Sequence, residues 1–289
     1  MDVYLLSHHL FANHVKKVDK YFTDLGPELV RAHLSVSRDK WLAVVFLVGS
    51  LSFIFTVVFG IIISIFAKGM VADSILLPIA AGLLISATSA FLAIKYPSVI
   101  ASERKKKIEN VIAFATIYMS TISRSGFPPQ QIFKMLSKFK EYGEVSIEAS
   151  LIARDVEVFG LDLTDALGKA IGRSPSADWT ELLAGLKTTI TIGGDLSAFL
   201  DEKAKGFVAD YKRRLQDFSN LLSILVEVYI TLVIVGAVFF IVTTSIVVAI
   251  GGVSTATIKL LNYAMVLIGI PVLTAAFILI IKGVSPLEE

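Results

Sequence analysis

The chain has 289 residues, of which 55% are hydrophobic, and its formal net charge is +2. This hydrophobic fraction is too high for an ordinary soluble domain, and the apolar residues are gathered in blocks, which indicates a membrane protein. The sequence contains no cysteine, which excludes disulfides, thiolate metal sites and cysteine nucleophiles.

The N-terminal arm, residues 1–40, is largely polar, so we expect it to be retained rather than removed as a signal peptide. It carries a helical stripe of apolar residues, with charges opposite, and Pro27 is expected to end that helix. The stripe consists of Phe11, Val15, Val18, Phe22 and Leu25. Such a helix lies on the membrane or packs on the protein, and the mixture of acids and bases on its polar face favours packing.

The four histidines also lie in the arm: His8, His9, His14 and His33. Five residues separate His9 from His14, which does not suit a shared helical face, so no metal site is predicted.

Four segments are apolar and long enough to cross roughly 30 Å of hydrocarbon. They are residues 41–66, 74–94, 221–250 and 261–281. In the second, Gly82, Ser86 and Ala90 form a small-residue stripe that lets another helix approach closely. Pro271 predicts a kink in the fourth. Glu227 is the one acid of the third segment. Because about twenty residues before residue 250 suffice to cross the membrane, Glu227 is expected near the membrane interface rather than in a proton relay.

Residues 95–220 predict a bundle of about six helices. Gly126 is expected to end the first helix, and Pro128 is expected at the start of the second. Gly160 is placed to form a left-handed C-terminal cap of the third helix. Asp162 is expected to cap the fourth helix. Pro175 then closes it, and Gly193 and Gly194 end the fifth. A sixth helix, from Asp195, continues without a breaker into the third span.

Lys and Arg are distributed unevenly around the spans. Six precede residue 41 and eighteen lie within residues 95–220, whereas the short connections hold only Lys68 and Lys259. Because positively charged loops stay in the cytoplasm, both termini and the bundle are predicted to be cytoplasmic. The sequence therefore predicts an all-α protein of the cytoplasmic membrane with four transmembrane helices and a helical bundle between the second and third. The predicted divisions are residues 1–40, 41–94, 95–220, 221–281 and 282–289.

Two basic runs flank the predicted bundle. They are Arg104, Lys105, Lys106 and Lys107 after the second span, and Lys212, Arg213 and Arg214 before the third. Both runs suit anchoring at anionic lipid headgroups, and the alternative is docking of an acidic protein partner. Nucleic acid is not expected as a partner because no recognised binding fold accompanies the charge.

Signatures of catalysis are missing from the sequence. Gly168-Lys169 lacks the upstream glycine and the hydroxyl residue of a phosphate-binding loop, and no serine-hydrolase or metalloprotease motif occurs. No catalytic, metal or cofactor site is predicted, and an enzyme is not expected.

The order of several short motifs gives the clearest functional indication. Ser-Gly-Phe-Pro-Pro precedes Gly-Leu-Asp-Leu-Thr-Asp-Ala-Leu, Pro175 and Gly-Gly-Asp-Leu, all between two pairs of spans. This order resembles the type II secretion system F-domain family, the platform proteins of type II secretion, type IV and tight-adherence pili and the archaellum. The residues that carry the resemblance are Gly126, Pro128, Gly160, Leu163, Leu167, Pro175, Gly193, Gly194, Leu196 and Leu200.

The resemblance implies a non-catalytic membrane platform that couples a cytoplasmic secretion ATPase to pilin-like subunits. The chain has one F domain where bacterial members usually have two, and Thr191 stands where those members tend to have Glu. It therefore looks more like tight-adherence or archaeal platforms, and a homodimer or a paired homologue would restore two domains. The alternative function is a small dimeric transporter with Glu227 on an ion path.

Overall fold

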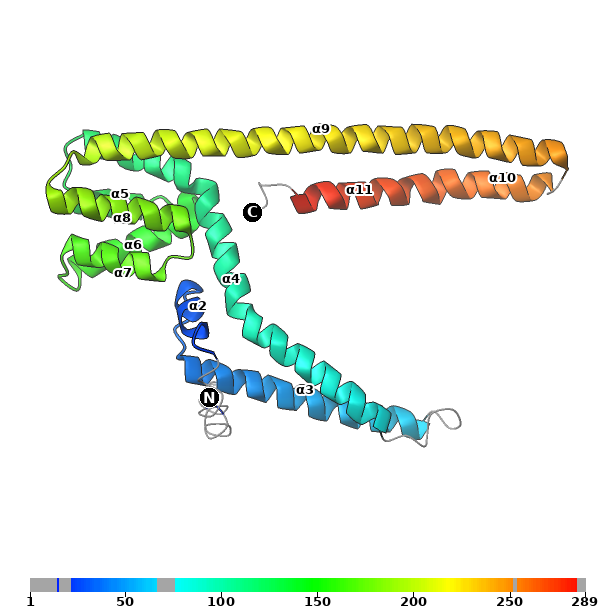
Figure 1. Ribbon diagram of the computed structural model, residues 1–289, viewed down its shortest axis with the longest axis horizontal. Helices are drawn as coiled ribbons and strands as arrows, with labels where there is room; N and C mark the ends of the chain where they lie inside the picture. Colours follow the sequence, from blue (N-terminus) through cyan, green and yellow to red (C-terminus); the bar gives the residue numbers. More distant parts are fainter. Residues whose placement is uncertain (1–14, 16–21, 67–75, 252–253, 285–289) are drawn as a thin grey trace. The chain divides into compact units, whose positions relative to one another are not determined.

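The computed structural model describes residues 15, 22–66, 76–251 and 254–284. All regular elements in these ranges are helical (Figure 1). The predictions for His8, His9, His14, Phe11, Val18, Lys68 and most of the C-terminal tail lie outside the described residues.

The chain divides into two compact units, Met1–Asp201 and Glu202–Glu289. The first unit contains α2 (Leu25–Arg31), α3 (Arg38–Phe66), α4 (Leu76–Arg124), α5 (Pro129–Leu136), the 3-10 turn η2 (Lys140–Tyr142), α6 (Gly143–Glu157), α7 (Leu163–Arg173) and α8 (Ala177–Ile192). The second unit contains most of α9 (Leu196–Ile250), then α10 (Thr255–Ala264), the π-helical turn η3 (Met265–Gly269) and α11 (Ile270–Val284).

Four helical stretches among the described residues are long and apolar enough to cross a membrane, in agreement with the four predicted spans. The helix of the second span does not end at residue 94, however. α4 is one helix of 49 residues that continues through Pro97 to Arg124. A run of charged residues ends a membrane crossing, but it does not end a helix, and α4 therefore joins a span directly to the domain that follows.

The small-residue stripe of α4 packs on α3 of the same chain. Ser86 Oγ donates a hydrogen bond to the carbonyl oxygen of Gly49 at 2.9 Å, and Ser52 and Ser89 join their hydroxyls at 2.8 Å. A Cβ added to Gly82 would lie 2.9 Å from Val57. The partner of the predicted stripe is therefore the first span.

The described residues of the arm pack against the start of α3, as the mixture of acidic and basic residues on its polar face predicted. Leu25 and Leu29 of α2 are buried in a cluster with Trp41 and Leu42 at the start of α3. The expectation that Pro27 ends a helix was wrong, because α2 begins at Leu25 and Pro27 lies in its first turn. Proline is tolerated there since the first backbone amides of a helix have no intrahelical acceptor.

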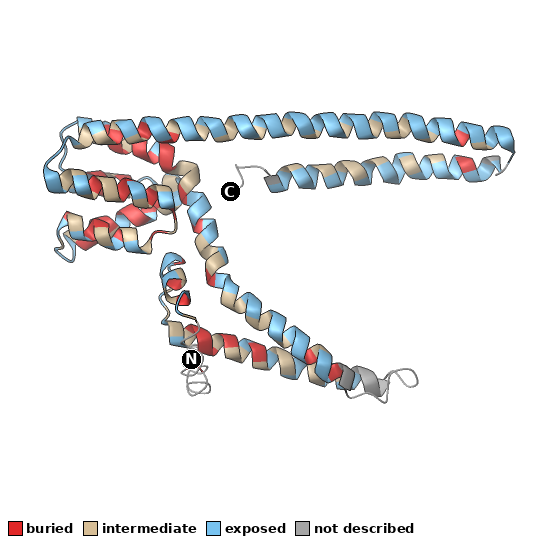
Figure 2. Cartoon of the chain, viewed as in Figure 1, coloured by how far each residue is buried: buried red, intermediate tan, exposed pale blue. Residues whose placement is uncertain are grey.

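Helices α5 to α8 and the C-terminal half of α4 surround one hydrophobic core. Figure 2 shows the buried residues concentrated in these helices. The largest side chains with almost no exposure include Trp179 of α8, Phe133 of α5 and Ile108 and Met119 of α4. The core follows from the apolar stripes of amphipathic helices that face inward.

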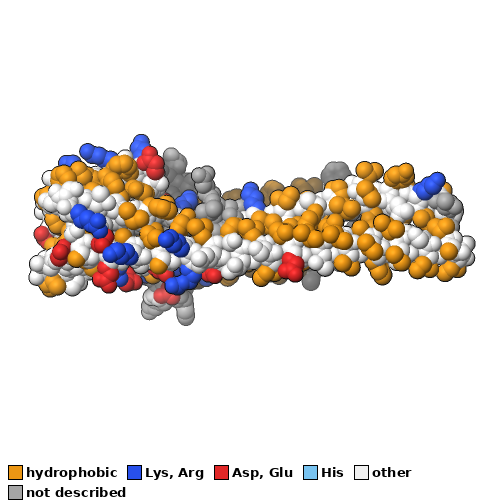
Figure 3. All heavy atoms as spheres, turned by 90° about the horizontal axis from the view of Figure 1, so that it is seen from above, with side chains coloured by type: hydrophobic (Ala, Val, Ile, Leu, Met, Phe, Trp, Pro, Cys, Tyr) orange, Lys and Arg blue, Asp and Glu red, His pale blue; other side chains and the backbone are white. Residues whose placement is uncertain are grey.

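In the second unit, α9 and α11 run side by side (Figure 1) and meet where Tyr229 contacts Thr274 and Phe277. Figure 3 shows hydrophobic side chains over most of the surface of these helices, as lipid contact requires. Near Pro271 the predicted fourth span contains the π-helical turn η3 instead of a simple kink. The backbone N–H of Ile270 donates a hydrogen bond to the carbonyl oxygen of Met265. The wider turn makes room for the proline ring.

Candidate functional site

The motif glycines occupy turns that only glycine adopts without strain. Gly126, Gly160 and Gly193 have φ angles of 78°, 67° and 69°. This left-handed conformation disfavours residues with a Cβ. The prediction of a left-handed cap at Gly160 is confirmed, and each turn separates two helices of the domain.

Aspartates cap the helices that follow two of these turns. Asp162 accepts a hydrogen bond from the backbone N–H of Thr164 at 2.9 Å, and Asp195 accepts one from Ala198 at 3.0 Å. Both interactions satisfy amides that have no partner within the helix. The hydrogen bonds from the Thr164 hydroxyl and amide lower the pKa of Asp162.

Three of the four motif leucines belong to the core, and Leu200 among them holds the start of α9 on the domain, whereas Leu196 is half-buried. Leu163 and Leu167 of α7 and Leu200 of α9 are buried. The ring of Phe199 lies so close to Gly185 of α8 that a Cβ added there would be 2.3 Å from it. The first turns of α9 are thus fixed to α8, at the beginning of the helix that forms the third span.

A fully buried carboxylate, Glu148 of α6, joins several elements of the first unit. Its Oε1 accepts a hydrogen bond from Arg104 Nη2 of α4 at 2.9 Å, and its Oε2 accepts one from Arg173 Nε of α7 at 2.7 Å. His33, between α2 and α3, lies 2.9 Å from Oε1. Arg104 also donates to Glu144 at 2.9 Å. The Glu148 cluster (Glu148, Arg104, Arg173, His33 and Glu144) therefore links the arm and three helices.

The cluster stabilises the charged form of Glu148. Burial alone raises the pKa of this carboxyl, but the hydrogen bond to His33 and the interactions with Arg173 and Arg104 outweigh burial and lower its pKa to about 2. Arg104 additionally donates to the backbone carbonyl of Arg31. The interior of the domain is thus held by a charged network as well as by apolar packing.

A comparison with protein families bears directly on this domain. The family model described as "Type II secretion system (T2SS), protein F" matches residues 115–244, which include all the motif turns. Residues 115–244 are thus similar to the type II secretion system F domain, and we call them the F domain. The family is one of non-catalytic membrane platforms, and with four candidate spans the chain is a multi-pass membrane protein.

Two relatives of this chain come from Methanocaldococcus jannaschii, and both are described as uncharacterized. One is 27% identical over 139 residues, which are 48% of this chain and 23% of the relative. The other is 33% identical over 102 residues, which are 35% of this chain and 30% of the relative. The chain thus spans less than a third of either relative. No solved structure matches.

The two predicted basic runs differ in accessibility. Lys105, Lys106 and Lys107 are exposed on α4, as are Lys212 and Arg213 on α9. Arg104 is 6% exposed and belongs to the Glu148 cluster. Its place in the basic run predicted a surface for lipid or a partner, but the structure turns its guanidinium inward, and it is not available to either.

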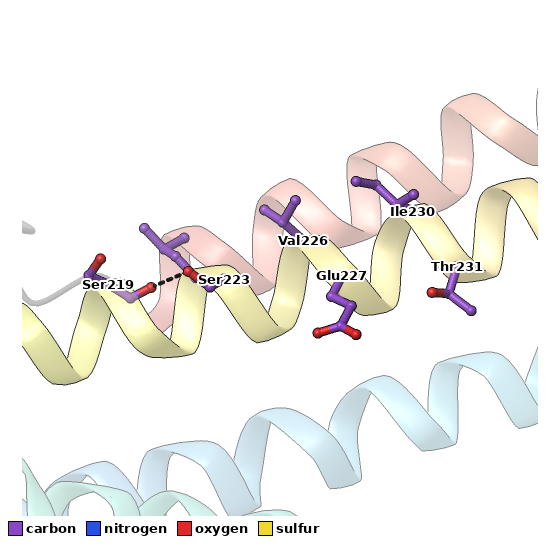
Figure 4. A pocket seen from close by; sticks show the side chains of 7 residues that line it. Ser219, Ser223, Val226, Glu227, Ile230 and Thr231 are labelled. Carbon is purple, nitrogen blue, oxygen red and sulfur yellow. Dashed lines mark hydrogen bonds between the residues drawn. The ribbon is translucent and has the colours of Figure 1, made fainter.

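Glu227 lies on the exposed surface of α9. Figure 4 shows its carboxylate on a different side of the helix from Val226 and Ile230, and the hollow beside it is lined by α9 residues alone. Ser223 and Thr231, one turn before and after, give this surface a polar stripe. Among the described residues, no group of three or more His, Asp or Glu side chains is placed to hold a metal ion.

Sequence reasoning missed the Glu148 cluster. A signal was present, because Glu148 and Asp155 fall on the same helical face as the apolar residues Val145, Ala149 and Ile152. An acid on a buried stripe requires a partner, but the sequence does not show which basic residue supplies it.

Proposed function

We propose that the chain is the platform of a type II secretion or type IV pilus-like machine, and that it passes the work of a cytoplasmic secretion ATPase to pilin-like subunits in the membrane. The observation that supports this most strongly is the F domain at residues 115–244, whose last helix is also a membrane span. In the proposed topology the arm, the helical domain and the C-terminal tail are cytoplasmic, as the distribution of Lys and Arg indicates.

Two continuous helices make such coupling mechanically plausible. α9 has 55 residues and α4 has 49, so at about 1.5 Å per residue they extend roughly 80 Å and 70 Å. Each has one part outside the predicted span and one part within it. A displacement of the F domain would therefore reach the membrane without passing through a loop.

The proposed assembly contains more than one copy of the domain. Because this chain has a single F domain, we propose that a second copy or a homologous platform subunit stands beside it. The exposed residues Lys105, Lys106, Lys107, Lys212 and Arg213, together with Arg214, are proposed to contact anionic headgroups of the membrane. Arg104 is omitted from this surface because it is buried.

Binding of the ATPase tests the first half of the proposal. The full chain in nanodiscs should bind the purified secretion ATPase of the same organism in at least one nucleotide state. A chain that binds it in none of the apo, ATP-analogue and ADP states would contradict the proposed function.

An interruption of α9 tests the second half. Asn220→Pro removes a backbone hydrogen bond and bends the helix just before the predicted span, whereas Asn220→Ala leaves it straight. We expect the proline variant to bind the ATPase but to lose filament assembly or secretion, and the alanine variant to keep both. Proton-coupled flux through the reconstituted protein that Glu227→Gln abolishes would instead favour the alternative transporter.

A further inference from the structure

The three motif turns of the F domain meet at one end of the first unit. Figure 1 shows the α4–α5, α6–α7 and α8–α9 connections at the same end of the helical domain. Contacts from separate helices agree: Arg124, at the end of α4, pairs with Asp201 near the start of α9, and Lys134 of α5 pairs with Glu157 at the end of α6 at 2.8 Å. We call this region the turn end.

Each turn carries an exposed apolar side chain beside its left-handed glycine. Phe127 follows Gly126, Phe159 precedes Gly160 and Ile192 precedes Gly193. Val158, Phe159 and Ile192 are 71%, 62% and 75% exposed, more than any other large hydrophobic side chain between residues 95 and 201.

These side chains stay exposed because other side chains fill the nearby core positions. The helix ends and the glycine φ angles fix the turns, so Phe159 and Ile192 remain outside the core that Leu163 and Leu200 fill. Phe159 is covered in part by the guanidinium of Arg154, 5.6 Å from its ring centre. Exposed apolar groups at one end of a domain, outside the spans of a membrane protein, indicate a contact surface.

Three aspartates lie in or just after these turns. Asp162, Asp165 and Asp195 are exposed beside the turns, whereas Arg124 is engaged by Asp201 and Arg154 lies over Phe159. The exposed lysines of α4, Lys105 to Lys107, belong to the other part of the helix, close to the span. The first unit therefore has a basic region near the membrane and an acidic, apolar region at its turn end.

We propose that the turn end is the docking surface for the cytoplasmic secretion ATPase, through an apolar recess edged with Lys and Arg side chains on the ATPase. This inference rests on the proposed function. It places the ATPase contact at the turn end and not at the basic runs. Charge complementarity supports a basic partner. A second copy is disfavoured because a two-fold contact would set Asp162, Asp165 and Asp195 against themselves.

A lipid surface is disfavoured by charge and by distance. Arg124 lies 29 residues after Lys95 on α4, or roughly 40 Å along the helix axis. The carboxylates of the turn end would also be repelled by anionic headgroups.

Binding to full-length variants in nanodiscs tests this surface. The double variant Phe159→Asp with Ile192→Asp should bind the purified secretion ATPase at least tenfold more weakly than the unchanged chain. Ile147→Asp is the matched control, since Ile147 is also an exposed hydrophobic residue of the domain, at 47%, but lies near the start of α6. The control should bind normally, and binding of the unchanged chain should weaken as salt is raised.

Labelling gives an independent readout that does not depend on weakened binding. Because the chain has no cysteine, Phe159→Cys, Ile192→Cys and Ile147→Cys each provide one thiol. The ATPase should slow maleimide labelling at residues 159 and 192 severalfold and leave residue 147 unchanged.

The outcomes separate the surface from the function. If the ATPase binds the unchanged chain, and the double variant binds equally well with no protection at 159 and 192, the docking surface is wrong and the proposed function stands. If the ATPase binds neither the unchanged chain nor the double variant, the docking surface and the proposed function are both wrong. If the double variant instead dissociates a dimer of the chain, or releases it from anionic vesicles, the turn end serves another occupant and the proposal is overturned.

Discussion

Arg104 Nη2 lies 2.9 Å from Glu148 Oε1, in the interior of the F-domain region, although the two residues are 44 positions apart in the sequence. The contact ties the helix of the second span to α6. A guanidinium that would otherwise extend the basic run of α4 thus supports the fold.

Removal of the Glu148 carboxylate should strongly destabilise the first unit. Glu148→Ala leaves Arg104 and Arg173 buried without their shared partner, which costs about 3–5 kcal/mol. Glu157→Ala is the control, because its ion pair with Lys134 is about half exposed and contributes about 0–1 kcal/mol. Denaturant unfolding of the full chain in detergent, followed by tryptophan fluorescence, measures both. Equal effects of the two variants would contradict the role of the cluster.

Acid should weaken the fold through the same carboxylate. The pKa of Glu148 falls from 4.5 to about 2 on folding, so its contribution is complete above pH 4.5 and is lost as the pH drops toward 2. Each pKa unit is worth about 1.4 kcal/mol, so the loss amounts to about 3 kcal/mol.

Glu148→Gln should remove most of this acid sensitivity. The variant is less stable at neutral pH, and its stability should change less between pH 4.5 and 2 than that of the unchanged chain. Asp162→Asn, at an exposed cap, should remove a smaller part. Unfolding curves at several pH values measure the slopes, and an unchanged slope in Glu148→Gln would argue against the assignment.

The glycines of the turns should be intolerant of a Cβ. Gly160→Ala and Gly193→Ala force a left-handed conformation on alanine and should cost about 1–2 kcal/mol each. Gly172→Ala is the control within α7, where a Cβ has open space and φ is ordinary, and it should stabilise the chain by up to about 1 kcal/mol. Thermal unfolding distinguishes the loss of stability expected for Gly160→Ala and Gly193→Ala from the gain expected for Gly172→Ala.

The first two spans should crosslink when their facing serines are replaced. Ser52 and Ser89 hydroxyls are 2.8 Å apart, so the Ser52→Cys, Ser89→Cys pair should form an intramolecular disulfide on mild oxidation. Adding Gly82→Leu should reduce the yield, because Val57 and Phe53 leave no room at that position, whereas Gly49→Ala meets only ordinary contacts and should leave it unchanged. Electrophoretic mobility reports the crosslink.

Local features of the fold were predictable from the sequence, whereas features that join distant residues were not. The cap at Asp162 and the turn at Gly160 depend on neighbouring residues, and both predictions were correct. Pro27 was misread because proline is compatible with both a helix start and a helix end. The continuity of α4 was missed because the second span and the first helix of the bundle were predicted as separate segments.

The candidate site shows the same division. The order of the motif turns is a property of the sequence, and it was enough to indicate the family. The Glu148 cluster joins residues from position 33 to position 173, and nothing in their spacing shows that they meet. The sequence also does not show that Phe159 and Ile192 are exposed, because apolar side chains at helix ends are compatible with burial in the core.

The side of the membrane on which the F domain lies tests the central claim most directly. Ile147→Cys and Ser254→Cys each place one thiol in the cysteine-free chain, on α6 and just before α10. In intact cells, a membrane-impermeant maleimide should label residue 254 and should reach residue 147 only after the membrane is permeabilised. Labelling of residue 147 in intact cells would put the domain outside, out of reach of any cytoplasmic motor, and would contradict the account.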